Sequence, residues 1–341
     1  MRSVLGLFIS GVIAGQIKYN TTIVESSSGN TAIAEAFIVN KLLKRYNIKF
    51  KAIIDSRIVN SDEKCKGKRI MRLADDVEII PISKEDPSAV NDRLKRVNEL
   101  KKLNNYYVPD QYDNPYAIFG TYFYLAREID EQLRRMGISW INLDYIVNSI
   151  STGAHSIGIG LFAKQKNTNV RIIGVEQLGS GILCDPFCLD SDGRIPIPYL
   201  VGGAGHRFPT YNVVRSLKLK DFWFKCAKVS DRISFQKCFE YKEKYNLCIG
   251  PSTGMLIAVV EAIAESEKNK NFLVISPDSF EDYPSLNTWY KIKALEEKVI
   301  SERLNGFDYR KHLAQNVYFM DVYNYAEGIR KYRTYMRGIL K

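Results

Sequence analysis

Three loops rich in serine, threonine and glycine carry the side chains of this sequence best suited to chemistry. They are Ser26–Thr31 (SSSGNT), Ser149–Ser156 (SISTGAHS) and Gly250–Gly254 (GPSTG). A strand that leads through such a turn into a helix leaves several backbone N–H groups pointing at one place, which suits an anion. One turn of this kind is usually only a helix cap. Three of them in this order indicate a binding site for an anion and a polar ring.

The order and spacing of these loops resemble the fold-type II pyridoxal-phosphate enzymes, the group of cysteine synthase and cystathionine β-synthase. The likeness runs from Met1 to about Trp289. TTIVESSSGNTAIA is similar to the family's substrate loop, SISTGAHSIGIG to its phosphate loop, IGPSTGMLIA to its pyridine loop and ISPDSFEDY to its Pro-Asp-Ser-Gly-Glu-Arg-Tyr segment. The resemblance implies an α/β fold of two α/β/α domains with parallel-rich sheets, tryptophan synthase β-like and N-terminally incomplete.

Pyridoxal 5'-phosphate is the cofactor that the resemblance implies. Its phosphate is expected at Ser151, Thr152, Gly153, Ala154 and His155. The family has glycine where this chain has Ser151 and Ala154, and a Cβ at Ala154 puts a positive φ there in doubt. His155 either donates to the phosphate or takes no part.

The ring of the cofactor has two matching residues. Ser252 matches the neutral serine that faces the ring nitrogen, and Asn30 matches the asparagine that binds the 3′-oxygen. A neutral partner keeps the pyridine weakly protonated, which favours β-elimination and replacement over transamination. The alternative for both residues is a helix cap.

The α-carboxylate of an amino-acid substrate has its own matching loop. The residues implied are Ser27, Ser28, Gly29, Thr31 and Gln111. Turn and cap chemistry is the alternative interpretation for each of them.

The lysine that forms the Schiff base in the family has no counterpart in this sequence. The family's Schiff-base lysine falls one position before Met1, and Arg2 falls where the arginine of the same motif belongs. The sequence leaves two alternatives open: an upstream piece is absent, or the protein is a natural lysine-less relative. In the second case it is a catalytically silent protein that binds a ligand or a partner.

The segment Gly202–Pro209 resembles the branch of the family that joins O-phosphoserine to glutamate on the way to 2,3-diaminopropionate. Arg207 in it suits a phosphate leaving group or an acidic nucleophile, and a surface ion pair is the alternative. The resemblance implies β-replacement on an activated serine, O-phosphoserine or O-acetylserine, through an aminoacrylate intermediate. The product is cysteine or a 2,3-diaminopropionate precursor.

Composition narrows the class of partner. The chain has 341 residues and a formal net charge of +11. No recognition motif accompanies that charge, so we expect no nucleic-acid partner. We expect small amino-acid substrates, a homodimer by resemblance, no membrane and a cytoplasmic location. The six cysteines do not form a disulfide pattern, and we expect free, largely buried thiols and no metal.

Alternating strand and helix patterns predict parallel sheets. The domains expected are a smaller one at residues 1–115, which carries the substrate loop, a larger cofactor domain at 116–290, and a helical C-terminal extension at 291–341. Leu5, Phe8, Ile9, Val12 and Ile13 recur at helical spacing and predict a buried first helix. A secretory signal peptide is the alternative for this segment.

Overall fold

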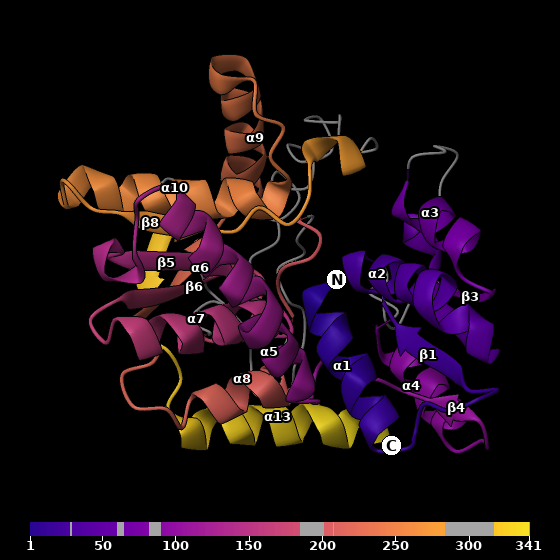
Figure 1. Cartoon of the computed structure of the whole chain (residues 1–341). Helices are drawn as coiled ribbons and strands as arrows, with labels where there is room; N and C mark the ends of the chain where they lie inside the picture. Colours follow the sequence, from indigo (N-terminus) through magenta and orange to yellow (C-terminus); the bar gives the residue numbers. More distant parts are fainter. Residues whose placement is uncertain are drawn as a thin grey trace, which may run out of the picture.

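The computed structural model describes residues 1–27, 29–59, 65–81, 90–184, 201–206, 208–283 and 317–340. These residues form two sheets, each covered by helices on both faces (Figure 1). This architecture confirms the predicted α/β/α fold with parallel-rich sheets.

The first sheet has the strand order β3-β2-β1-β4, and all its strands are parallel. Its elements are α1 (Arg2–Ile13), β1 (Thr22–Ser26), α2 (Asn30–Ile38), β2 (Lys49–Asp55), α3 (Lys66–Leu73), β3 (Asp76–Ile80), α4 (Val90–Lys101) and β4 (Tyr106–Tyr107). Successive strand side chains point to opposite faces. Ile23 therefore packs with α1 and α2, and its neighbour Val24 packs with α4.

The second sheet has the order β8-β5-β6-β7-β9. Its elements are α5 (Tyr116–Gly120), α6 (Ala126–Arg135), β5 (Tyr145–Ser149), α7 (Ala154–Lys166), β6 (Arg171–Gln177), α8 (Tyr211–Ser216), β7 (Lys225–Val229), α9 (Asp231–Tyr245), α10 (Pro251–Ser266), β8 (Phe272–Val274), β9 (Val317–Met320) and α13 (Tyr325–Leu340). Alternation again divides the core. Val147 packs with α10, and Ile146 packs with α6 and α7.

The C-terminal segment departs from the expected all-helical extension. Residues 317–320 form β9, which pairs antiparallel with β7 and covers the edge of the second sheet. The apolar run Val317–Met320 suits a strand, and the prediction of helix there is wrong. Helix α13 follows and runs beneath α8 toward the first sheet (Figure 1). The domain limits 1–115, 116–290 and 291–341 stay a prediction.

The first helix forms as expected, but its buried face differs from the predicted one. Leu7 and Phe8 are buried, while Ile9, Val12 and Ile13 are exposed. The predicted burial of these last three residues is wrong. The reason is that α1 packs against α5 through small residues, with Gly6 lying against Gly120. The face of α1 that carries Gly6 is therefore the buried one. Among the described residues, no helix is both long and apolar enough to cross a membrane.

Candidate active site

Two of the serine-rich loops leave the carboxyl ends of parallel strands, and the third opens a helix. The first connects β1 to α2, the second connects β5 to α7, and the third begins α10 at Pro251. Carboxyl ends of strands in open α/β sheets are the usual place for ligands. The structure therefore sets three helix N-termini where the sequence predicted the site.

The phosphate loop takes its left-handed residue at Gly153, with φ +83°. Ala154 is the first residue of α7, so its Cβ does not prevent the turn. The Ser151 hydroxyl donates to the Gly205 carbonyl at 3.3 Å, and the Ala154 N–H donates to the Thr152 hydroxyl at 3.3 Å. The loop is thus preformed around a glycine that permits it.

His155 lies on the first turn of α7. Burial lowers the pKa of His155 to about 4, and a hydrogen bond with the Ser149 backbone opposes the shift. The imidazole is therefore neutral at pH 7 and adds no positive charge to the phosphate loop. Its neutral N–H keeps the ability to donate a hydrogen bond.

Ser252 is the clearest feature of the pyridine loop. It lies on the first turn of α10 and is 1% exposed, and its hydroxyl has no hydrogen-bond partner among the residues that the structure describes. Leaving a buried hydroxyl unpaired costs about 1–3 kcal/mol. A ring nitrogen at this point would pair it. The residues present therefore fit the cofactor: Ser252 would face the ring nitrogen, and Ser151–His155 would hold the phosphate.

The substrate loop contacts Gln111, the other residue predicted to bind the substrate α-carboxylate. The Thr31 hydroxyl donates to the Gln111 Oε1 at 2.8 Å, although the two residues are 80 positions apart. The Gly29 N–H donates to the Ser27 hydroxyl at 3.4 Å. Ser28 and Arg207 lie outside the described residues, so their predicted roles stay predictions.

Asn30 contacts the other half of the molecule. Its amide nitrogen donates to Asp278 Oδ2 at 3.1 Å, and the Lys66 ammonium donates to the same oxygen at 3.0 Å. Lys66 also lies 2.7 Å from the Tyr283 hydroxyl. Asn30 and Lys66 belong to α2 and α3, while Asp278 and Tyr283 follow β8. These contacts draw the two sheets together across the site.

Sequence reasoning missed Lys66. Asp278 and Tyr283 both belong to the ISPDSFEDY segment. The resemblance of this segment to the family was the only sequence signal for these two residues. Lys66 has no motif of its own. Its side chain is 13% exposed and that of Asp278 is 4% exposed, so the pair is better shielded from water than an ordinary surface ion pair.

Two glutamates lie buried beneath the substrate loop. Glu25 on β1 is 2% exposed, and burial with the nearby charge of Asp110 raises its pKa to about 8. Glu35 on α2 is fully buried, and within the described part of the chain neither of its carboxylate oxygens has a hydrogen-bond partner. Burial, with Glu25 nearby, raises the pKa of Glu35 well above its ordinary value. Glu25 is therefore largely protonated at pH 7, and the pKa of Glu35 is shifted in the same direction.

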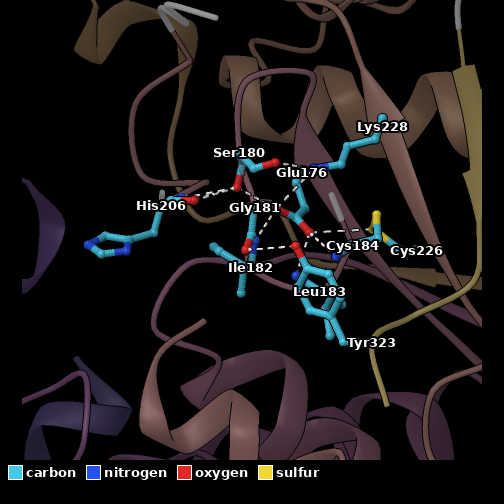
Figure 2. The surroundings of a disulfide bond; sticks show 10 residues. All are labelled: Glu176, Ser180, Gly181, Ile182, Leu183, Cys184, His206, Cys226, Lys228 and Tyr323. Atoms are coloured by element: carbon cyan, nitrogen blue, oxygen red, sulfur yellow. Dashed lines mark hydrogen bonds and ion pairs between the residues drawn. A yellow bond between two sulfur atoms is a disulfide. The ribbon is translucent and has the colours of Figure 1, made fainter. Parts of the chain in front are cut away.

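A third buried carboxylate, Glu176 on β6, binds the turn that follows this strand (Figure 2). It accepts backbone N–H groups of the next turn: Ile182 at 2.9 Å, Leu183 at 2.7 Å and Cys184 at 3.3 Å. Lys228 lies 3.4 Å away, and both side chains are fully buried. Only an acidic residue in an otherwise apolar strand signalled this site in the sequence.

The turn held by Glu176 continues to the phosphate loop. The Ser180 hydroxyl donates to the His206 carbonyl at 3.0 Å, and the Gly205 N–H donates to the Ile150 carbonyl at 2.8 Å. Glu176, Ser180, Gly205 and Ile150 thus form a chain of contacts. These contacts connect the turn after β6 to Ile150, which lies in the loop expected to hold the phosphate.

Cys184 and Cys226 form a disulfide next to this network (Figure 2). The prediction of free thiols is wrong for these two residues. They lie 42 positions apart in the sequence, and only the packing of the turn after β6 against β7 brings them together. With Glu176 they also form the one group of three metal-type ligands found among the described residues. The disulfide and the backbone N–H groups already engage these atoms.

Comparison with known proteins decides the family. Residues 6–278 match the family described as pyridoxal-phosphate dependent enzyme. The chain belongs to this family. Its enzymes use pyridoxal phosphate, which agrees with the unpaired Ser252 hydroxyl and the preformed phosphate loop.

Two relatives of this chain are named for the activities of cystathionine beta-synthase and cysteine synthase. A cystathionine beta-synthase of Dictyostelium discoideum is 29% identical over 275 residues, which cover 79% of this chain and 50% of that protein. A cysteine synthase of Helicobacter pylori is 28% identical over 280 residues, which cover 81% of this chain and 80% of that protein. The chain thus spans half the length of the first relative and most of the second.

A solved structure has a similar fold over most of this chain. The O-acetylserine dependent cystathionine beta-synthase from Helicobacter pylori superposes with a TM-score of 0.67 at 25% identity, covering 84% of each chain.

Proposed function

We propose that this protein catalyses β-replacement on an activated serine with pyridoxal phosphate. The buried, unpaired Ser252 hydroxyl at the start of α10 is the observation that carries the proposal. A neutral hydroxyl suits a ring nitrogen that stays weakly protonated, and such a ring favours β-replacement. The names of the cysteine synthase and cystathionine beta-synthase relatives support the same reaction class.

The cofactor, when bound, supplies the electron withdrawal that lets a group on the substrate Cβ leave. In the replacement the bond from Cβ to the ester oxygen breaks and a bond from Cβ to the nucleophile forms. Acetate or phosphate leaves, and the nucleophile gives up a proton. The chain's own residues position the reactants: Thr31 and Gln111 at the α-carboxylate, and Asn30 at the 3′-oxygen.

Ser252→Ala tests the cofactor assignment through affinity alone. We expect the affinity for pyridoxal phosphate to fall by roughly tenfold, because the lost hydrogen bond to a buried atom is worth about 1–3 kcal/mol. Asn30→Ala should change the absorbance spectrum of the bound cofactor, because it removes the donor to the 3′-oxygen. An absorbance titration measures both. Ser266→Ala, at the other end of α10, is the matched control. Unchanged affinity and spectra would show that the loops are misassigned.

O-phosphoserine is the donor that we propose. Support comes from the resemblance of Gly202–Pro209 to the phosphoserine-using branch and from the charge-assisted bond that Arg207 offers a phosphate. We expect Arg207→Ala to lower kcat/KM for O-phosphoserine about tenfold more than for O-acetylserine. Arg232→Ala, on the exposed side of α9, is the control. A wild-type preference for O-acetylserine, the donor in the name of the Helicobacter pylori relative, would move the protein to that branch.

The choice of protein for these assays depends on the lysine that the resemblance sets before Met1. The genomic DNA immediately upstream is read first, and any in-frame Ser-x-Lys segment found there is included. Turnover only in the longer chain would assign that lysine. Absence of turnover in both, with cofactor bound, would favour the silent, ligand-binding alternative.

A homodimer is the assembly that we propose. Exposed apolar side chains gather on α1 and on the helical segment 116–125 that packs beside it: Ile9, Val12, Ile13, Phe119 and Phe123. Large exposed apolar patches commonly mark protein–protein contacts. This surface fits a second copy of the chain, as the family resemblance implies.

A further inference from the structure

Four aromatic side chains from three separate segments meet near the candidate active site. Tyr112 follows β4, His206 and Phe208 precede α8, and Tyr335 lies on α13. The ring centres are 5.6 Å apart for Tyr112 and His206, 5.3 Å for His206 and Tyr335, and 4.7 Å for the stacked pair Phe208 and Tyr335. All four side chains are half-buried. We call this group the aromatic wall.

The aromatic wall joins the two loops expected to hold substrate and cofactor. Tyr112 directly follows Gln111, whose side chain accepts the Thr31 hydroxyl at 2.8 Å. His206 directly follows Gly205, whose carbonyl accepts the Ser151 hydroxyl at 3.3 Å. Tyr112 and His206, which contact each other in the wall, are thus the sequence neighbours of a residue bonded to the substrate loop and of a residue bonded to the phosphate loop.

Helix α13 is held firmly in this place. The Tyr332 hydroxyl donates to Asp113 Oδ2 at 2.6 Å, and its ring stacks on Tyr211 at 5.2 Å. Asp113 also accepts the Tyr211 N–H at 2.9 Å. These bonds fix α13 against the loop that carries Gln111. Helix α13 lies beyond residues 6–278, so the family match does not account for it.

We propose that the aromatic wall is the subsite for the second substrate, and that this substrate is an organic amine or thiol with an aromatic or cationic group. The inference rests on the proposed β-replacement. Aromatic faces bind planar rings and cations, which gain contact with several rings at once. Inorganic sulfide offers no such surface, so a wall of four rings would contribute nothing to its binding. Tyr335 is then a specificity residue contributed by the C-terminal helix.

Binding of 2-phenylethylamine, which carries both a ring and a cation, tests the wall without turnover. We expect Tyr335→Ala to weaken its binding to the cofactor-loaded protein about tenfold in calorimetry. Tyr335→Phe keeps the ring and should bind within about twofold of the wild type. Tyr325→Ala is the matched control, because Tyr325 lies at the other end of α13, against Lys218. Benzyl alcohol and methylamine as further probes separate the contributions of ring and charge.

Kinetics distinguish this inference from the proposed reaction. With the donor saturating, Tyr335→Ala should raise KM for the aromatic amine about tenfold, with a smaller effect on kcat, whereas Tyr325→Ala should change neither. Tyr335→Leu, which retains bulk, replaces the alanine variant if the latter does not fold. Two results would overturn the inference and leave the β-replacement proposal standing. One is equal amine binding in the wild type and in the ring-less variants. The other is turnover with sulfide but with none of the organic amines and thiols. Absence of any turnover would fail the proposed function, while calorimetry would still report on the wall.

Discussion

Glu176→Gln is expected to lower the free energy of unfolding by about 3–5 kcal/mol. The change removes the carboxylate from a fully buried ion pair and leaves the Lys228 ammonium with a neutral acceptor, the Ser180 carbonyl. Breaking a buried ion pair by removing one member has a cost of this size, because the remaining charge stays desolvated. The Ile182 and Leu183 N–H groups also lose a charged acceptor. Denaturation in urea, followed by tryptophan fluorescence, measures the loss.

The double variant Glu176→Gln with Lys228→Met is the control for this interpretation. It removes both charges, so most of the lost stability should return, and the two changes should be strongly non-additive. A loss under about 1 kcal/mol in the single variant would contradict a paired, charged Glu176. Because Ser180 links this network to His206, the single variant should also weaken cofactor binding.

Stability is expected to fall as the pH rises from about 5 to 8, because of Glu25 and Glu35. Burial raises the pKa of Glu25 to about 8 and that of Glu35 well above its ordinary value of 4.5. At a pH between the ordinary value of 4.5 and the raised pKa in the folded state, the folded protein keeps protons that the unfolded chain has released. This contribution to stability is complete below pH of about 4.5 and is lost as the pH rises through the folded pKa.

Glu35→Leu should therefore stabilise the protein at pH 8 and make the decline of stability with pH shallower, because the raised pKa of Glu35 no longer contributes. Neither carboxylate oxygen of Glu35 has a partner to lose, and an apolar side chain suits the buried face of α2. Glu131→Gln, on the exposed surface of α6, is the control. Chemical denaturation at several pH values provides the curve. Wild-type stability that is flat or rising over this range would show that both glutamates are ionised and paired in the folded state.

The local sequence determined the first helix and the three serine-rich loops. Each loop begins a helix, and this depends on residues within a few positions of one another. The sequence Ser151-Thr152-Gly153-Ala154 contains one glycine, and the left-handed turn falls on that glycine, with Ala154 free to start α7. The resemblance of these short segments to a known family was enough to predict the fold and the cofactor.

Only the tertiary structure decided which distant groups meet. The prediction of free thiols was wrong because Cys184 and Cys226 are brought together by the turn after β6, which no local pattern encodes. The prediction of a helical end was wrong at β9, because an edge of the second sheet was available for pairing. Lys66 reaches Asp278 across 212 positions, and Tyr332 reaches Asp113 across 219. Such contacts depend on how whole sheets and helices pack, and the free energy of that packing is spread over many residues rather than carried by a motif.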